Sequence, residues 1–196
     1  MPIRNADRSI LLTGDASGRV LSVIVCGAGP AAAVPRLVRL AIDRGWAVQV
    51  IATPAALEFI DQAEIEELTG NPVRSQYSRP GSPRSRIPDA IIVAPATYNT
   101  VNKWAQGTSD TYALGILGEM TGMGTPIVVL PFVNSALASR VAFRRSIETL
   151  RSEGVLILLG PGGFEPHPPR TGGNRTEAFP WHLALDEVGH LIDART

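Results

Sequence analysis

The stretch that decides the fold is IIVAPATYNT, residues 91–100. Four apolar residues run directly into Pro95 without alternating with polar ones, which is typical of a strand buried on both faces inside a parallel sheet. We expect Pro95 to end this strand and the hydroxyl-bearing residues after it to lead into a helix. Ligands of open α/β sheets bind at the carboxyl ends of strands, so this turn is a candidate site, although a helix-capping turn without a ligand explains the same residues.

The rest of the chain repeats the alternation of buried strand and helix. Apolar runs predict further strands at residues 20–26, 47–52, 126–131 and 155–159. Helical spacing predicts helices at residues 31–44, 61–70, 101–106, 111–120, 139–153 and 181–194. Strands that alternate with helices predict a three-layer α/β/α fold around a doubly wound parallel sheet, Rossmann-like and flavodoxin-like, in a single domain.

We divide the chain into three parts. Residues 1–19 are a polar N-terminal lead-in, residues 20–161 form the α/β domain, and residues 162–196 hold a Gly/Pro-rich segment followed by a C-terminal helix. A long loop is expected at residues 71–88, and loops of this length in a compact domain are usually functional or mobile.

Composition excludes several classes of function. The 18 basic and 18 acidic residues cancel, so the chain has no overall charge that would favour nucleic acid or an anionic membrane. No window approaches the roughly 18 consecutive apolar residues of a membrane span. The N-terminus lacks the features of a secretory signal, and one cysteine rules out an internal disulfide, so we expect a cytoplasmic protein. The 3 histidines all follow residue 166 and form no close-spaced set of metal ligands.

Small polar residues follow several predicted strands. Gly27, Ala28 and Gly29 come after the first strand, Thr53 after the second and Asn134 after the fourth. Glycines let a backbone approach a phosphate, but the third glycine of a dinucleotide-binding motif is absent. Each position alone is explained equally well by a turn or a helix cap.

The order of these motifs resembles that of the homo-oligomeric flavin-containing cysteine decarboxylases. PATYNT, residues 95–100, is similar to the P-A-S-A-N-T motif of that family. Gly107 and Asp110 resemble its glycine and aspartate after the next helix, and residues 131–138 match its P-x-M-N-x-x-M-W motif in part. The resemblance covers roughly residues 20–161.

The resemblance implies a bound FMN, a thiol-containing or cysteine-like carboxylate as substrate, small or peptidyl, and a homotrimer or higher homo-oligomer. By this resemblance the flavin oxidises the cysteine side chain, after which carbon dioxide leaves. The implied FMN-binding residues are Gly27, Ala28, Gly29, Thr53, Pro95, Ala96, Thr97, Asn99, Thr100 and Asp110. Asn134 is the implied catalytic and substrate-binding residue. Arg84 and Arg86 are candidates for bidentate binding of a substrate carboxylate, unless their loop is merely solvated.

The sequence departs from the family pattern at the positions that carry the chemistry. The family's catalytic histidine, about eight residues before the aspartate matched by Asp89, corresponds to Gly81 or Ser82. Val133, Leu137 and Ala138 replace the two methionines and the tryptophan of the substrate motif. His182, delivered by a neighbouring subunit, is one candidate replacement. The alternatives are a non-catalytic flavin-binding regulatory protein and a flavin prenyltransferase-like enzyme of the same fold.

Overall fold

The computed structural model describes residues 18–77 and 85–195, and its core is a sheet of 5 parallel strands. The strands are β1 (Val20–Val25), β2 (Ala47–Ala52), β3 (Ala90–Ala96), β4 (Ile127–Pro131) and β5 (Leu156–Ile157). Their order across the sheet is β2-β1-β3-β4-β5. This order confirms the predicted doubly wound sheet and is the flavodoxin-like one, with the direction of strand addition reversing between β1 and β3.

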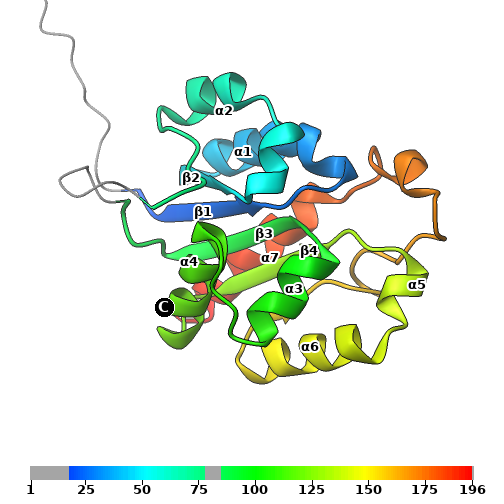
Figure 1. Ribbon diagram of the computed structural model, residues 1–196. Coiled ribbons are helices and arrows are strands. Elements are labelled where there is room, and N and C mark those ends of the chain that lie inside the picture. Colours follow the sequence, from blue (N-terminus) through cyan, green and yellow to red (C-terminus); the bar gives the residue numbers. More distant parts are fainter. Residues whose placement is uncertain (1–17, 78–84, 196) are drawn as a thin grey trace, which may run out of the picture.

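Helices cover both faces of the sheet (Figure 1). On one face lie α1 (Val34–Asp43) and α7 (Trp181–Asp193), with α2 (Gln62–Thr69) packed against α1. The other face is covered by α3 (Tyr98–Ala105), α4 (Tyr112–Gly122) and α6 (Val141–Ser152). Four short elements remain: η1 (Gly29–Ala33), η2 (Pro54–Glu58), α5 (Ser135–Ala138) and η3 (Gly172–Arg175).

The central strands are buried along their whole length. Every residue of β1, β3 and β4 is buried, as expected for apolar runs without alternation. Their side chains point alternately into two apolar clusters, one beneath α1 and α7 and the other beneath α3, α4 and α6. Both clusters hold the strands in place, so the loops at the strand ends stand on a rigid base.

The prediction that Pro95 ends the third strand is wrong, because β3 continues to Ala96. The Ala94–Pro95 peptide bond is cis, and the register of β3 against β4 shifts between Val93 and Ala96. Proline removes one N–H donor but keeps its carbonyl, and the Pro95 oxygen accepts a hydrogen bond of 3.1 Å from the Cys26 N–H. The Ala96 carbonyl accepts from Phe132 N at 2.9 Å, so pairing resumes beyond the irregularity.

Other predicted boundaries moved by short distances. The helix predicted at residues 31–44 is divided into η1 and α1, and the one predicted at residues 139–153 begins at Val141 after the separate α5. The last strand is only 2 residues long. Part of the predicted long loop pairs with the edge of the sheet, because Arg74 forms an isolated parallel bridge with Ile51 on β2.

Candidate functional site

A cavity of about 640 Å³ opens at the carboxyl ends of the strands, around the point where the strand order reverses. Its walls come from the segments that follow β1, β2, β3 and β4, with one residue from the Gly/Pro-rich segment. The volume lies within the range of about 300–1,000 Å³ found for pockets that bind compact organic ligands. The predicted residues that line it are Gly27, Ala28, Gly29, Thr53, Thr97, Asn99, Thr100 and Asn134.

The turn between β1 and η1 packs directly on the next loop. A Cβ atom at Gly27 would lie 2.8 Å from the carbonyl oxygen of Ala55, a distance that real Cβ atoms do not reach. Gly27 therefore lets two backbone segments meet without a side chain between them. Beside them, the side chain of Thr53 makes no cap hydrogen bond, so its hydroxyl is free to bind a ligand.

The amino end of α3 presents donors to the cavity. Thr97 caps the helix, because its Oγ1 accepts a hydrogen bond of 3.3 Å from the Thr100 N–H, and the two threonine hydroxyls lie 3.0 Å apart. The N–H groups of Tyr98 and Asn99 have no intrahelical acceptor at this end of the helix. Together with the helix dipole, they favour an anionic group.

Asn134 combines a structural and a potential binding role. Its Oδ1 accepts a hydrogen bond of 2.9 Å from Leu137 N, so Asn134 caps α5. Its Nδ2 group donates no hydrogen bond to any described residue and remains available in the wall of the cavity. Asn134 can therefore cap the helix and donate to a ligand at the same time.

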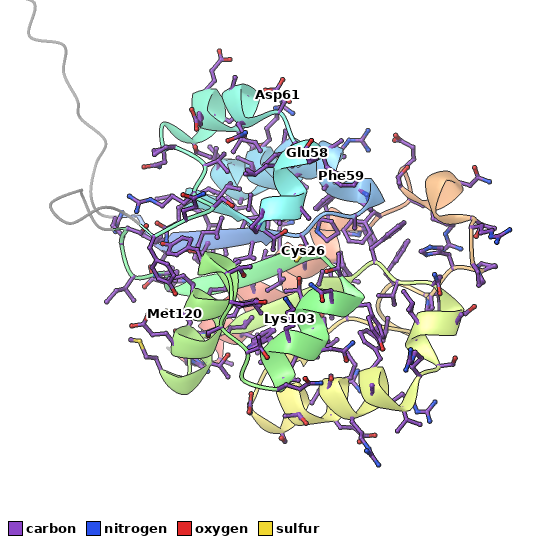
Figure 2. All side chains as sticks on the ribbon, in the orientation of Figure 1. Cys26, Glu58, Phe59, Asp61, Lys103 and Met120 are labelled. Carbon is purple, nitrogen blue, oxygen red and sulfur yellow. The ribbon has the colours of Figure 1, made fainter. Side chains whose placement is uncertain are left out.

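Lys103 is a cavity residue that the sequence reasoning did not identify. It lies in the last turn of α3 (Figure 2), and its Nζ donates to the carboxylate of Asp110. Asp110, predicted to bind the cofactor, does not itself line the cavity but holds this lysine. The cavity wall thus includes a cation as well as the neutral donors at the amino end of α3.

Some predicted residues lie elsewhere. Pro95 and Ala96 are buried in β3 beneath the cavity and do not line it. Arg86 is bonded at the opposite end of the sheet, where its guanidinium donates to the Gly18 carbonyl at 3.3 Å, just before β1 begins. Arg84 falls outside the described residues, as do Gly81 and Ser82.

His167 is the second cavity residue that the sequence reasoning missed. It comes from the Gly/Pro-rich segment, which Figure 1 shows beyond the carboxyl ends of the strands, and its ring lies 4.7 Å from that of Phe132, another cavity residue. His182, which we considered as a candidate, is exposed on α7 and does not line the cavity. The only signal for His167 is a histidine flanked by prolines a few residues after the last strand.

Cys26 lies at the end of β1 beneath this cavity (Figure 2) and is 1% exposed. Burial raises the pKa of the Cys26 thiol, and hydrogen bonding to Thr100 and Thr97 offsets this only in part. The sulfur is therefore an apolar packing group beneath the threonines and not a nucleophile.

We expect the Cys26 thiol to be unreactive in the folded protein. A disulfide reagent such as dithionitrobenzoate should modify it at least about two orders of magnitude more slowly than in denaturant, because reaction requires local opening of the core. The release of one equivalent of thionitrobenzoate per chain after denaturation is the internal control. Equal rates in the two states would contradict the buried position.

The described residues, 18–77 and 85–195, contain no helix long and apolar enough to cross a membrane. In the same ranges no group of 3 or more His, Cys, Asp or Glu side chains is arranged to hold a metal ion.

Comparisons with known proteins agree on one family. A family model described as Flavoprotein matches residues 11–171. Among curated relatives, the Coenzyme A biosynthesis bifunctional protein CoaBC of Escherichia coli (strain K12) is 29% identical over 148 residues, covering 72% of this chain and 36% of that protein. The chain thus spans about a third of the length of this relative.

Solved structures agree on the fold. A mutant PPC decarboxylase superposes with a TM-score of 0.70 at 16% identity, covering 90% of this chain and 99% of that one. The FMN-dependent cysteine decarboxylase SpaF superposes with a TM-score of 0.62 at 24% identity, covering 89% of this chain and 98% of that one. At these identities the likeness establishes the common architecture.

Proposed function

The chain belongs to the Flavoprotein family, and from this premise we propose that it binds FMN in the cavity described above and uses it to oxidise and decarboxylate a cysteine-like or thiol-containing carboxylate. The observation that carries the proposal is the meeting of the Gly27 turn, Thr53 and the amino end of α3 in one cavity at the reversal of strand order. The names of the similar proteins support it, since they include an FMN-dependent cysteine decarboxylase and a PPC decarboxylase.

The residues present fit an FMN molecule. Its phosphate needs several donors, which the free N–H groups at the start of α3, the hydroxyl of Thr53 and the backbone at Gly27 can supply. Lys103 adds a positive charge, although the carboxylate of Asp110, with which it forms an ion pair, partly neutralises this charge. The remaining wall is largely apolar, with Leu114 and Phe132, and suits a flat aromatic ring system.

When bound, FMN supplies a two-electron acceptor for the carbon–sulfur group of the substrate. With that acceptor the substrate would lose a hydride from the carbon that bears sulfur and a proton from the thiol, and the resulting C=S bond would accept the electron pair of the C–C bond to the carboxylate as carbon dioxide leaves. In this scheme Asn134 Nδ2 would donate a hydrogen bond to the substrate carboxylate and so orient the substrate in the cavity.

We also infer a homo-oligomer, a homotrimer or larger, and assign residues 20–161 as the flavoprotein domain, to whose cavity His167 adds one residue from the segment 162–196. A second candidate function is a flavin-binding regulatory protein without turnover. The sequence observation that favours it is the occurrence of Gly81 and Ser82 where the resembling family has its histidine.

We expect the purified protein to bind one FMN per chain and to become yellow. Riboflavin, which lacks the phosphate, should bind about 10- to 100-fold more weakly, because charge-assisted hydrogen bonds contribute about 1.5–3 kcal/mol. Quenching of flavin fluorescence on titration measures both affinities. A protein that takes up no FMN would refute the proposal, whereas equal affinities would place the phosphate outside the donor cluster.

Anaerobic mixing with substrate distinguishes the two candidate functions. A panel of cysteinyl peptides and small thiol acids should bleach the flavin absorbance and release carbon dioxide if the protein is an enzyme. Unchanged absorbance across the panel, with FMN bound, would favour the regulatory protein.

A further inference from the structure

The backbone of His167 is fixed beside Asn134. The two residues form an isolated parallel bridge, in which Ser135 N donates to the His167 carbonyl at 2.8 Å and His167 N donates to the Val133 carbonyl at 3.4 Å. The Gly/Pro-rich segment therefore attaches to the loop between β4 and α5, the loop that carries the proposed carboxylate-binding amide.

The imidazole ring packs against Phe132 and Gly172. It lies against Phe132 with 33° between the ring planes, and the residue is only 6% exposed. A Cβ atom at Gly172 would lie 2.9 Å from His167 Nε2 and 3.3 Å from the Phe132 ring. Any side chain at residue 172 would press on both rings, so the glycine keeps the edge around Nε2 clear of a side chain.

Neither ring nitrogen of His167 makes a hydrogen bond to a described residue. Nδ1 is buried and has no hydrogen-bond partner among the described residues. Buried polar atoms without a partner are rare and call for an explanation, of which a catalytic role is one. Because Nδ1 is enclosed, Nε2 is the nitrogen that the ring can offer to a ligand in the cavity.

We propose that His167 is the acid–base residue of this cavity, and that its Nε2 takes the proton from a substrate thiol. The inference rests on the proposed function. In the step assigned to His167, the S–H bond breaks, the proton passes to Nε2, and the electron pair stays on sulfur, where it forms the C=S bond as the hydride leaves for FMN. After carbon dioxide departs, the imidazolium returns the proton to the sulfur or carbon of the product.

The surroundings keep the imidazole neutral, which is the form that can act as a base. Burial lowers the pKa of His167 below its usual range, and the positive charge of Arg175 on η3 lowers it further. Among the other charged or titratable groups, Tyr98 on α3 and Lys103, paired with Asp110, line the same cavity, and Glu165 and Arg170 are neighbours in the sequence. The loop from Phe132 to Ala138 contains no titratable side chain.

The first test replaces His167 with glutamine (His167→Gln) and uses His190→Gln as the matched control. His190 is exposed in the last turn of α7, nine residues after Trp181, which is about 13 Å along the helix. We expect His167→Gln to keep its FMN affinity, while the anaerobic bleaching of bound flavin by a cysteinyl peptide slows by about 10²- to 10⁴-fold. His190→Gln should behave as the wild type.

A spectroscopic measurement tests contact with the thiol independently of turnover. N-acetylcysteamine has a thiol but no carboxylate, and its thiolate beside oxidised flavin gives a broad long-wavelength absorbance. Under anaerobic conditions this band should form at a lower pH in the wild type than in His167→Gln, where it needs the higher pH at which the free thiol ionises. The same midpoint in both proteins, or no band in the wild type, would overturn the proposal.

Two further measurements test the role of His167 even if His167→Gln folds poorly. They also separate this inference from the proposed function. Gly172→Ala keeps the histidine but presses on Nε2, and it should raise the pH midpoint of the long-wavelength band with FMN still bound.

The second measurement uses the FMN-free protein. The wild type should lose stability as the pH falls through about 6.5, because the unfolded chain takes up a proton that buried His167 resists. Urea titrations should show a smaller loss in His167→Gln. If the wild type bleaches and His167→Gln bleaches equally fast, only this inference fails, whereas no FMN uptake refutes the proposed function itself.

Discussion

Replacing Asn134 with aspartate is expected to lower kcat/KM by more than about 10-fold while leaving FMN binding and folding nearly unchanged. Aspartate caps helices as well as asparagine does, so the hydrogen bond from Leu137 N to the side chain of residue 134 persists. The change removes only the Nδ2 donor and puts a negative charge where the substrate carboxylate binds. Loss of one charge-assisted hydrogen bond, about 1.5–3 kcal/mol, lowers kcat/KM by about 10- to 100-fold, and repulsion between the two carboxylates lowers it further.

Two companion variants separate the cap from the donor. Asn134→Ser keeps a capping oxygen and removes the amide donor without adding charge, so it should lose turnover to a smaller extent than Asn134→Asp. Asn134→Ala removes both and should also destabilise the fold by about 1 kcal/mol in urea titrations. Steady-state kinetics and flavin fluorescence on all three give the comparison. If Asn134→Asp lost FMN instead, the side chain would belong to the cofactor and not to the substrate.

The sheet could be predicted from the sequence because each strand is marked by an apolar run of its own residues. Apolar runs such as residues 20–25 and 127–131 have one stable placement, the interior of a parallel sheet, and they occupy it. The continuation of β3 through Pro95 was not predictable in the same way. It depends on partners far along the chain, because the N–H groups of Cys26 and Phe132 donate hydrogen bonds to the carbonyls of Pro95 and Ala96.

The cavity was accessible from the sequence in part, for a reason of topology. Parallel strands end at one edge of a sheet, so residues directly after them, such as Gly27, Thr97 and Asn134, must meet there. His167 follows no such rule, since it is brought in by a bridge to Asn134 within an irregular segment. Arg86 illustrates the converse, because a long loop gives no indication of which end of the sheet it approaches.

Replacing Gly27 with alanine is the change expected to damage cofactor binding most. The added Cβ would lie 2.8 Å from the Ala55 carbonyl oxygen, and the obstructing atoms are backbone, so no flexible side chain can move aside. Overpacking of this kind costs about 1–3 kcal/mol. The β1–η1 turn and η2 must separate, which moves the donors that we assign to the phosphate, and the Kd for FMN should rise by at least about 10-fold.

Gly189→Ala is the matched control for Gly27→Ala. Gly189 lies within α7, where a Cβ atom would meet nothing within 4 Å, so the same chemical change should leave FMN affinity unaltered. It should stabilise the fold slightly, because glycine within a helix is less favourable than alanine by about 0.5–1 kcal/mol. Fluorescence titration with FMN and urea denaturation of the FMN-free proteins give both quantities. Unchanged FMN affinity in Gly27→Ala, together with a loss of stability, would mean that the turn supports the fold but does not contact the cofactor, and the phosphate site would then have to be sought at the amino end of α3 alone.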